Sequence, residues 1–348
     1  MRKKTNAFIL ILLSLCFPIS GCSSPASGSK VGMLTSTGII EGQSFSSGVW
    51  SGIQQAKKDF SFETVHAKPE AETPDGYLKE ADTLYTAGYR MIVAPGAEFS
   101  KTVFDAQSKY SDARFILIDG EPSDAGGNVS ISQNTVALLF AEQESGFLAA
   151  VASALQLKTG HFAVILSSKD PSLSRYKNGF VQGVNYANKN FGTGIALERS
   201  DFVFINGPDD LDGAKKAAGA FYDRGVDAIF TPCGAAAGAV ISEAVERSQN
   251  GTPAFVVGTD SDLYDDGIYD GKKSVLLTSA VKKADAAAYY IIEKIFDNQF
   301  PGGQTVVLNT GNGGVGLPES NPNLREDVIK TVNLLLKQLK SGDLTVNE

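Results

Sequence analysis

Short apolar runs rich in β-branched residues alternate with longer amphipathic runs along most of this chain. This alternation is typical of a parallel β-sheet whose strands are joined by crossover helices. The pattern occurs twice, once in each half, and predicts an α/β protein with two doubly wound parallel-sheet lobes. We expect strands at 31–35, 63–66, 91–94, 115–118, 162–166, 228–231, 254–258 and 275–278. We expect helices at 46–58, 76–87, 99–110, 137–156, 172–189, 210–223, 236–248 and 284–296.

Polar and glycine-rich residues follow the predicted strands in both halves of the chain. Thr35 to Gly38 come after the first strand, Ser167 to Asp170 after the first strand of the second half, and Thr259 to Asp262 after a later one. Doubly wound sheets bind ligands outside the carboxyl ends of their strands. Because loops from both halves share this chemistry, the sequence predicts one polar ligand bound in a cleft between two lobes.

Residues 1–21 have the pattern of a secretory signal peptide. Arg2, Lys3 and Lys4 form a cationic start, an apolar run extends from Ala7 to Ile19, and small residues follow it. The apolar run is too short to cross a bilayer with margin. We therefore expect this segment to be removed after export.

Cys22 stands at the predicted cleavage point. The residues Ile-Ser-Gly-Cys at 19–22 resemble the lipobox at which bacterial lipoproteins are cut before their new N-terminal cysteine is acylated. Each buried methylene of an acyl chain contributes ~0.8 kcal/mol, so several chains hold a domain at a membrane. We expect a lipidated cysteine and tether at 22–30 and a place on the extracytoplasmic face of the cell membrane. An ordinary signal peptide followed by a coincidental cysteine is the alternative.

Cysteine content and charge restrict the remaining chain. Cys16 lies in the signal peptide and Cys22 is the predicted anchor, so Cys233 has no intramolecular disulfide partner. Removing the signal peptide leaves 28 of the 31 basic residues against 39 acidic ones, a net charge of about −11. Because such a surface repels phosphate backbones, we expect no nucleic-acid partner.

The sequence lacks the motifs and residue spacings that are typical of enzyme active sites and metal-binding sites. His66 and His161 each lie at the edge of a predicted strand with no carboxylate or cysteine at metal-ligand spacing. Cys233 has no obvious histidine partner to activate it. Phosphate-binding and serine-nucleophile motifs are also missing. We therefore expect no metal, no cofactor, no catalytic residue and no enzymatic activity.

Several weak motifs occur together in a specific order. They are VGMLTSTGIIEGQSFSSGVWSG at 31–52, ESGFLA at 144–149, RYKNGFVQG at 175–183, GTD at 258–260, TSAVK at 278–282 and NGGVGL at 312–317. Their order and spacing resemble the basic membrane protein family of ABC-transporter solute-binding lipoproteins, which includes PnrA-like purine nucleoside receptors.

The resemblance implies a fold and a division into lobes. The fold would be of the type I periplasmic-binding-protein class, with a three-strand hinge and a central ligand cleft. Crossovers near 132–134, 278–280 and 302–303 would give an N-terminal lobe of 31–134 plus 280–303. The C-terminal lobe would be 135–279 plus 304–348. Three crossovers would let the lobes close as rigid bodies.

The resemblance also implies a set of ligand contacts. Phe45 would stack on a purine face and Tyr176 would supply a second aromatic wall. Asp260 would accept hydrogen bonds from ribose hydroxyls, and Lys282 would donate to them. The residues alone leave other roles open: Phe45 seating the first helix, Tyr176 on a helix face, Asp260 as a turn acceptor, and Lys282 in solvent.

This chain departs from the family at several positions near the start of the first helix, and two of them are predicted ligand-binding residues. Ser36 stands where an aspartate is usual after the first strand, and Ser46 stands where the helix start usually has asparagine. Because a site built to hydrogen-bond one ligand discriminates against analogues, these changes could redirect it.

The resemblance implies a function and partners. The protein would be a monomeric binding subunit of an ABC importer that captures a small polar ligand, most simply a nucleoside, and works with a permease and an ATPase. The alternative is a sensing or surface lipoprotein of the same fold that binds another sugar-like ligand without transport.

Overall fold

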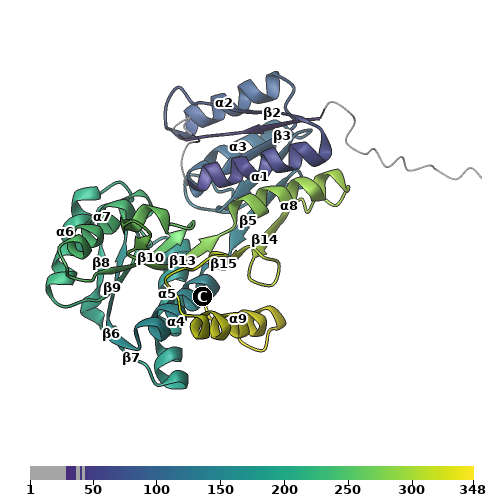
Figure 1. Cartoon of the computed structure of the whole chain (residues 1–348). Coiled ribbons are helices and arrows are strands. Elements are labelled where there is room, and N and C mark those ends of the chain that lie inside the picture. The colour runs from purple at the N-terminus through teal and green to yellow at the C-terminus, as the bar shows by residue number, and fades with distance from the viewer. Residues whose placement is uncertain (1–28, 37–39, 41–43) are drawn as a thin grey trace, which may run out of the picture.

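The computed structural model describes residues 29–36, 40 and 44–348, which form two lobes (Figure 1). The predicted signal peptide, the predicted anchor Cys22 and the tether up to residue 28 lie outside the described residues. So do residues 37–39 and 41–43, which belong to the loop after the first strand. The α/β class and the parallel sheets predicted from the sequence are confirmed.

The first lobe is built on a six-stranded sheet in the order β14-β5-β4-β3-β1-β2. All five pairings are parallel. Strands covered on both faces read as continuous apolar runs, as the fully buried Met-Ile-Val-Ala-Pro run of β3 does. The strands are β1 (Lys30–Met33), β2 (Glu63–His66), β3 (Met91–Pro95), β4 (Arg114–Ile118), β5 (Thr135–Phe140) and β14 (Gln304–Leu308).

Helices cover both faces of this sheet. The helices α1 (Phe45–Phe60) and α8 (Ala284–Phe296) pack on one face. The other face is covered by α2 (Pro74–Thr86) and α3 (Ser100–Lys109). Ser44 caps the start of α1, because its hydroxyl accepts a hydrogen bond from the backbone N–H of Ser47. The cap leaves Phe45 as the first residue of the helix.

The second lobe is built on a seven-stranded sheet in the order β15-β13-β10-β9-β6-β7, with β8 also paired to β6. Only the β13–β15 pair is antiparallel among the pairings described for this sheet. The strands are β6 (Thr159–Leu166), β7 (Gly194–Ala196), β8 (Phe202–Phe204), β9 (Ala228–Phe230), β10 (Phe255–Asp260), β13 (Leu276–Lys282) and β15 (Val315–Gly316). A small hairpin joins β11 (Ile268–Asp270) to β12 (Lys273–Ser274).

Five helices surround the second sheet. The helices α4 (Glu142–Leu157) and α5 (Pro171–Phe191) cover one face, and α9 (Glu326–Ser341) packs outside α4. The helices α6 (Leu211–Asp223) and α7 (Ala237–Gln249) cover the other face. Short 3-10 helices are η1 (Ala97–Phe99), η2 (Arg199–Asp201), η3 (Gly234–Ala236) and η4 (Asp265–Gly267).

The chain passes between the lobes three times: after β5, after β13 and after β14. The crossing segments lie side by side, since the Ala141 N–H donates to the Leu308 carbonyl (2.9 Å) and the Lys283 N–H donates to that of Gly314 (2.8 Å). Because β5 and β14 both pair into the first sheet, the chain leaves that sheet after Phe140 and Leu308. The boundaries expected from the sequence were 134 and 303.

The helix expected at 137–156 begins later, at Glu142, because the apolar run Thr135–Phe140 forms a buried strand. The close contact of α4 with α5 then fixes how these two helices present polar side chains at the hinge. At Gly179 a Cβ atom would lie 2.0 Å from the Gln143 carbonyl oxygen, so a side chain there would push the helices apart.

Candidate functional site

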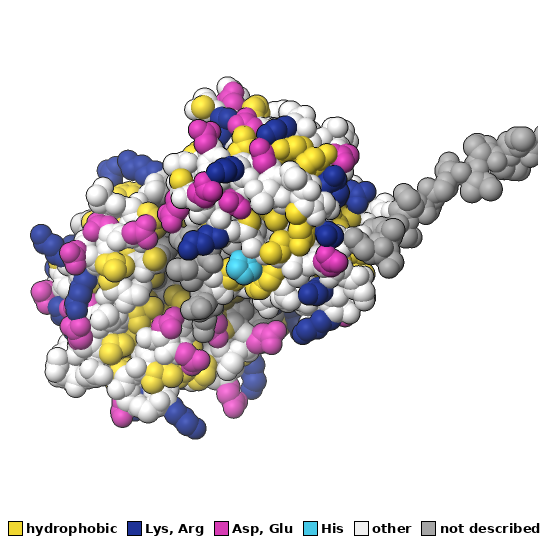
Figure 2. All heavy atoms as spheres, turned by 90° about the horizontal axis from the view of Figure 1, so that it is seen from above, with side chains coloured by type: hydrophobic (Ala, Val, Ile, Leu, Met, Phe, Trp, Pro, Cys, Tyr) yellow, Lys and Arg dark blue, Asp and Glu magenta, His cyan; other side chains and the backbone are white. Residues whose placement is uncertain are grey.

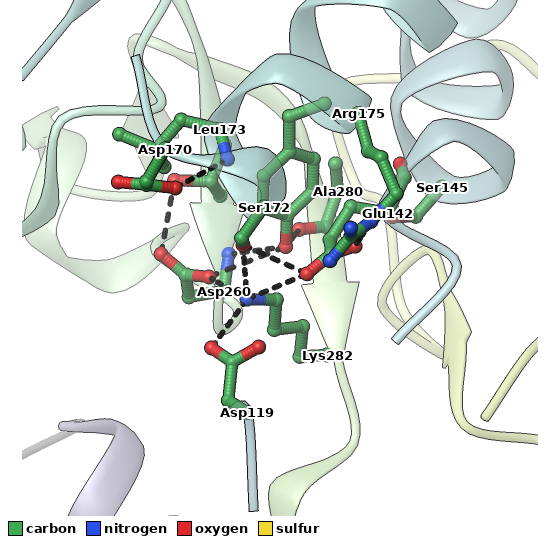
Figure 3. Close-up of polar contacts among 12 residues, drawn as sticks. Asp119, Glu142, Ser145, Asp170, Ser172, Leu173, Arg175, Asp260, Ala280 and Lys282 are labelled. Carbon is green, nitrogen blue, oxygen red and sulfur yellow. Dashed lines mark hydrogen bonds and ion pairs between the residues drawn. The ribbon is translucent and has the colours of Figure 1, made fainter. Parts of the chain in front are cut away.

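Lys282, the last residue of β13, lies at the crossing between the lobes and at the centre of an ionic cluster (Figure 3). Its Nζ atom is 2.7 Å from Asp119 Oδ2 and 3.0 Å from Glu142 Oε1. Asp260 Oδ1 is farther away, at 3.7 Å. Only 3% of the Lys282 side chain is exposed. One buried ammonium group therefore connects carboxylates from both lobes.

The carboxylates come from the ends of elements that the fold brings together. Asp119 follows β4 of the first sheet, whereas Asp260 ends β10 of the second sheet. Glu142 is the first residue of α4, just after the crossing from β5. This arrangement agrees with the expectation that polar groups at carboxyl ends of strands from both halves meet at one place.

Glu142 is fully buried and holds further polar partners around Lys282. Its Oε2 accepts a hydrogen bond from Arg175 Nε (2.6 Å), and its Oε1 accepts one from the Ser172 hydroxyl (2.7 Å). The Lys282 ammonium also donates to the Ser172 oxygen (2.8 Å). The two cations thus share Glu142, while Asp119 and Asp260 remain on the cleft side of the cluster.

The cluster keeps Lys282 and Glu142 charged despite their burial. Burial by itself lowers the pKa of Lys282, but Asp119, Glu142 and Asp260 outweigh it, so that pKa lies above its ordinary value. Burial raises the pKa of Glu142, yet Lys282 and Arg175 bring it below its ordinary value. For Asp119 burial prevails over the attraction of Lys282, and its pKa is raised.

Asp119 and Asp260 share an uncommon backbone conformation, with φ of 68° at each. Aspartate tolerates this left-handed region better than most residues, and such residues gather at functional sites. Asp119 Oδ1 is buried and has no hydrogen-bond partner among the described residues. Asp260 keeps about a third of its side chain exposed. Asp260 lines both cavities described below and can accept hydrogen bonds from a molecule in the cleft, whereas Asp119 lines neither of them.

Phe45 lies beside this cluster and lines two cavities. Its ring meets Phe140 edge-on at 6.1 Å, and Lys282 Nζ is 5.9 Å from its centroid. One cavity, of about 660 Å³, runs from Phe45 and Asp260 toward α7. The other, of about 480 Å³, includes Lys282 and the segment around Pro318. Phe45, Asp260 and Lys282, three of the predicted ligand contacts, therefore line one cavity.

Tyr176 has a different place from the one expected. Its side chain is fully buried, its ring packs edge-on against Phe230, and it lines neither of these cavities. Its hydroxyl lies 3.3 Å from Asp260 Oδ1 and 3.1 Å from the Ala280 carbonyl oxygen. Tyr176 thus supports Asp260 from behind instead of forming an aromatic wall, because α5 packs its start against the sheet.

Ser36 and Ser46 line neither cavity either. Ser36 is half-buried at the end of the first strand, beside residues outside the described part of the chain. Ser46 is half-buried in the first turn of α1, where Ser44 makes the cap. The ligand contacts expected of these two serines therefore stay predictions.

Three charged residues of the cluster, and Ser172 with them, were not predicted from the sequence. Asp119 carried a usable signal, because it directly follows a predicted strand in the same way as the other polar strand ends. Glu142 and Arg175 carried none, since each lies in a predicted helix with no spacing that indicates a buried pair. Only the packing of α4 against α5 brings them within 2.6 Å.

Outside this cluster we examined the residues that could bind a metal ion or act as a nucleophile. The described residues contain no group of three or more histidine, cysteine or acidic side chains placed to hold a metal ion. His161 lies at the start of β6 and pairs with the buried Asp201, with its Nε2 2.8 Å from Oδ2. Burial raises the pKa of Cys233, to about 12, so its thiol is a poor nucleophile. Across the described part of the chain, no helix combines the length and the apolarity needed to cross a membrane.

The face seen in Figure 2 carries acidic and basic side chains interspersed over both lobes, with apolar side chains between them. No single-sign patch dominates this view.

Solved structures show the same architecture. A solute-binding protein of an ABC transporter system from Aeropyrum pernix matches with a TM-score of 0.71 at 21% identity, covering 92% of this chain and 94% of that one. A solute-binding protein from Conexibacter woesei matches with a TM-score of 0.67 at 16% identity, covering 92% and 99%. At these identities the likeness establishes the fold alone.

Sequence comparisons identify the family. The model of the family described as "ABC transporter substrate-binding protein PnrA-like" matches residues 29–346. Relatives include a CD4+ T-cell-stimulating antigen of Listeria monocytogenes, 25% identical over 100% of this chain and 99% of the relative. Another is the ABC transporter nucleoside-binding protein BmpA of Lactococcus lactis, 25% identical over 95% and 96%. Basic membrane protein B of Borreliella afzelii is 28% identical over 89% and 87%. This chain therefore belongs to the PnrA-like family of ABC transporter substrate-binding proteins.

Proposed function

We propose that this protein is the nucleoside-binding subunit of an ABC importer and that the ligand lies between the lobes, against Phe45. The family supports a small-molecule ligand, transporter partners and a place outside the cytoplasm. The observation that carries the nucleoside assignment is the juxtaposition of Phe45 with the charged cluster of Asp119, Asp260 and Lys282. A relative from Lactococcus lactis is named as a nucleoside-binding protein, which supports the same ligand class.

The site has the two chemistries that a nucleoside requires. A base presents flat apolar faces, and stacking on an aromatic ring contributes ~1–3 kcal/mol per base in single-stranded nucleic-acid sites. Ribose hydroxyls lose water on burial and need charged acceptors and donors in return. Asp260 is part-exposed and lines both cavities, so it can accept from a diol, and Lys282 in the second cavity can donate to it.

The hinge gives ligand binding a mechanical consequence. Asp119 belongs to the first lobe, while Asp260 and Lys282 end strands of the second sheet. A ligand that stacks on Phe45 of the first lobe and bonds to Asp260 and Lys282 stabilises the arrangement in which the lobes are close together. The closed form is then the one presented to the permease, and the protein acts as a monomer without catalysing a reaction.

We infer that Cys22 carries the lipid anchor that keeps this receptor at the extracytoplasmic face of the membrane. Replacing Cys22 with alanine should move the protein from the membrane fraction to the soluble exported fraction. If the Cys22→Ala protein remained in the membrane fraction as fully as the parent, the anchor would lie elsewhere.

Thermal melting of residues 23–348 tests the ligand class. A ligand that binds only the folded state stabilises it by RT ln(1 + [L]/Kd), so melting temperature should rise with concentration for at least one nucleoside. Free bases and free pentoses should give smaller shifts, because each meets only half of the site. Unchanged melting with every nucleoside at millimolar concentration would exclude this function.

A further inference from the structure

The 660 Å³ cavity continues beyond the polar cluster as an apolar groove. The groove is lined by Ile241 and Val245 of α7. Leu263, which follows β10, and Ile268, which begins β11, complete its apolar lining. From Ala237 to Val245, which both line the cavity, the helix rises about 12 Å. We call the surface formed by these four apolar residues the α7 groove.

The α7 groove is continuous with the ligand cleft. The same cavity includes Phe45 and Asp260, and part of its wall is made of small residues from η3 and the start of α7: Gly234, Ala235, Ala237 and Gly238. At Gly238 a Cβ atom would meet no other atom within 4 Å, so this wall borders open space. A flat ring lying against Phe45 can therefore extend along α7 without meeting a bulky side chain.

The charge of the groove restricts what can occupy it. Its described lining contains two carboxylates, Asp260 and Asp266, and no basic side chain. Burial, together with Asp265 and Asp262, raises the pKa of Asp266. A phosphate or carboxylate in this part of the cavity would lie among acidic side chains, without a basic side chain in the described lining. An uncharged apolar group suits the groove.

The α7 groove shares one cavity with Phe45 and Asp260. In the proposed binding mode the sugar hydroxyls bond to Asp260 and Lys282 and the base stacks on Phe45. The apolar lining of the shared cavity is then available to a substituent on the base.

We propose that the α7 groove is a specificity site for an apolar substituent on the base, so that the receptor prefers base-alkylated or base-arylated nucleosides over unmodified ones. This inference rests on the proposed nucleoside function and deepens it. It assigns Val245 and Ile268 as residues that determine specificity.

The test compares adenosine with N6-benzyladenosine by calorimetric titration of residues 23–348. Since a single methylene group in an apolar pocket is worth ~10-fold or more in discrimination, N6-benzyladenosine should bind at least about tenfold more tightly. The double variant Val245→Ser with Ile268→Ser should lose that preference and keep its affinity for adenosine. Both residues are partly exposed, so the variant should fold.

A matched control is Leu211→Ser, at the start of α6 in the same lobe. Leu211 is 53% exposed and does not line the cavity, so this variant should keep the full preference. Equal or weaker binding of N6-benzyladenosine by the parent protein would overturn the inference while leaving the nucleoside function in place. A preference that survives in the double variant would also overturn it. Failure of both compounds, and of every other nucleoside, to bind would instead overturn the proposed function.

Discussion

At the scale of single residues, the cleft is organised by an imbalance of charge. Two cations, Lys282 and Arg175, lie among three carboxylates. Arg175 Nε pairs with Glu142 Oε2 at 2.6 Å. The Lys282 ammonium group is therefore the cation that interacts with Asp119, Glu142 and Asp260 together. Because this happens in a buried place, removing the ammonium group leaves carboxylates uncompensated, which costs more than losing an exposed ion pair.

Replacing Lys282 with methionine tests this account. We expect the free energy of unfolding to fall by about 3 kcal/mol, as when one partner of a buried ion pair is removed, and ligand affinity to fall as well. Urea unfolding and calorimetry would measure the two effects. The matched control is Lys283→Met: Lys283 is half-buried and makes no ion pair with the described residues, so its loss should change stability by less than ~0.5 kcal/mol. Equal effects of the two substitutions would contradict the central role of Lys282.

Phe45 allows stacking to be separated from folding. Phe45→Ala should weaken nucleoside binding by ~1–3 kcal/mol, about 5- to 150-fold, while the melting temperature of the free protein changes little. Phe60, at the other end of α1, stacks on Phe296 with centroids 4.9 Å apart. Phe60→Ala should do the reverse, lowering the melting temperature with little effect on affinity. Loss of stability without loss of affinity in Phe45→Ala would mean that Phe45 only seats the helix.

The site was partly predictable from the sequence at this scale. The rule that ligands meet the carboxyl ends of strands pointed to Asp260, and it would have pointed to Asp119 had it been applied to the strand that ends at Ile118. The role of Tyr176 could not be foreseen, because only tertiary packing decides that its ring is buried and its hydroxyl supports Asp260. Glu142 likewise depends on where β5 ends and α4 begins.

At the scale of elements, the contact between α4 and α5 holds the cluster in place. Glu142 begins α4, while Ser172, Arg175 and Tyr176 lie in the first two turns of α5. The helices approach closely because Gly179 has no side chain. A change in their spacing would move the partners of Lys282 even though no cleft residue had been altered.

Gly179→Ala should therefore destabilise the protein by about 1–3 kcal/mol, since the new methyl group would overlap the Gln143 carbonyl. Gly238→Ala in α7 is the matched control, because its Cβ would meet open space. That substitution should stabilise the protein by ~0.5–1 kcal/mol, as alanine is the better residue inside a helix. Urea unfolding of both variants would measure the difference. Similar effects would contradict the close α4–α5 contact.

The buried carboxylate of Glu142, at the start of α4, makes the stability of the protein depend on pH. The pKa of Glu142 is lowered in the folded protein, so its stabilising contribution is fully present above its ordinary pKa and is lost as pH falls through the lowered value. The difference in unfolding free energy between the parent and Glu142→Gln should shrink from pH 7 toward pH 3. Asp119, whose pKa is raised, has the opposite sign but remains in both proteins. A difference that does not vary with pH would show that the Glu142 charge does not stabilise the fold.

Helices and strands were predicted with the right bounds where the spacing of apolar residues was clear. They were misplaced or missed elsewhere. The helix at 284–296 and the strand at 63–66 have the predicted bounds. The apolar residues at 135–140 run directly into those of α4, and periodicity alone does not separate a buried strand from a buried helix. The helix α9 was missed although its buried residues, Val328, Val332, Leu335 and Leu339, have helical spacing.

At the scale of the whole molecule, three adjacent crossings connect two independently packed sheets (Figure 1). Each sheet has its own apolar cores, and the charged cluster lies where the crossings meet. The repeated alternation in the sequence was sufficient to predict two such lobes. It could not locate the crossings to the residue, because short strands such as β14 are assigned to a sheet only by their neighbours.

The whole account depends on a nucleoside binding where both lobes contribute. Calorimetric titration of residues 23–348 with a panel of purine and pyrimidine nucleosides, repeated on Lys282→Met, measures this most directly. We predict one-to-one binding of at least one nucleoside by the parent protein and at least a tenfold weaker affinity in the variant. Absence of binding for every nucleoside, or an affinity that is unchanged in Lys282→Met, would contradict it.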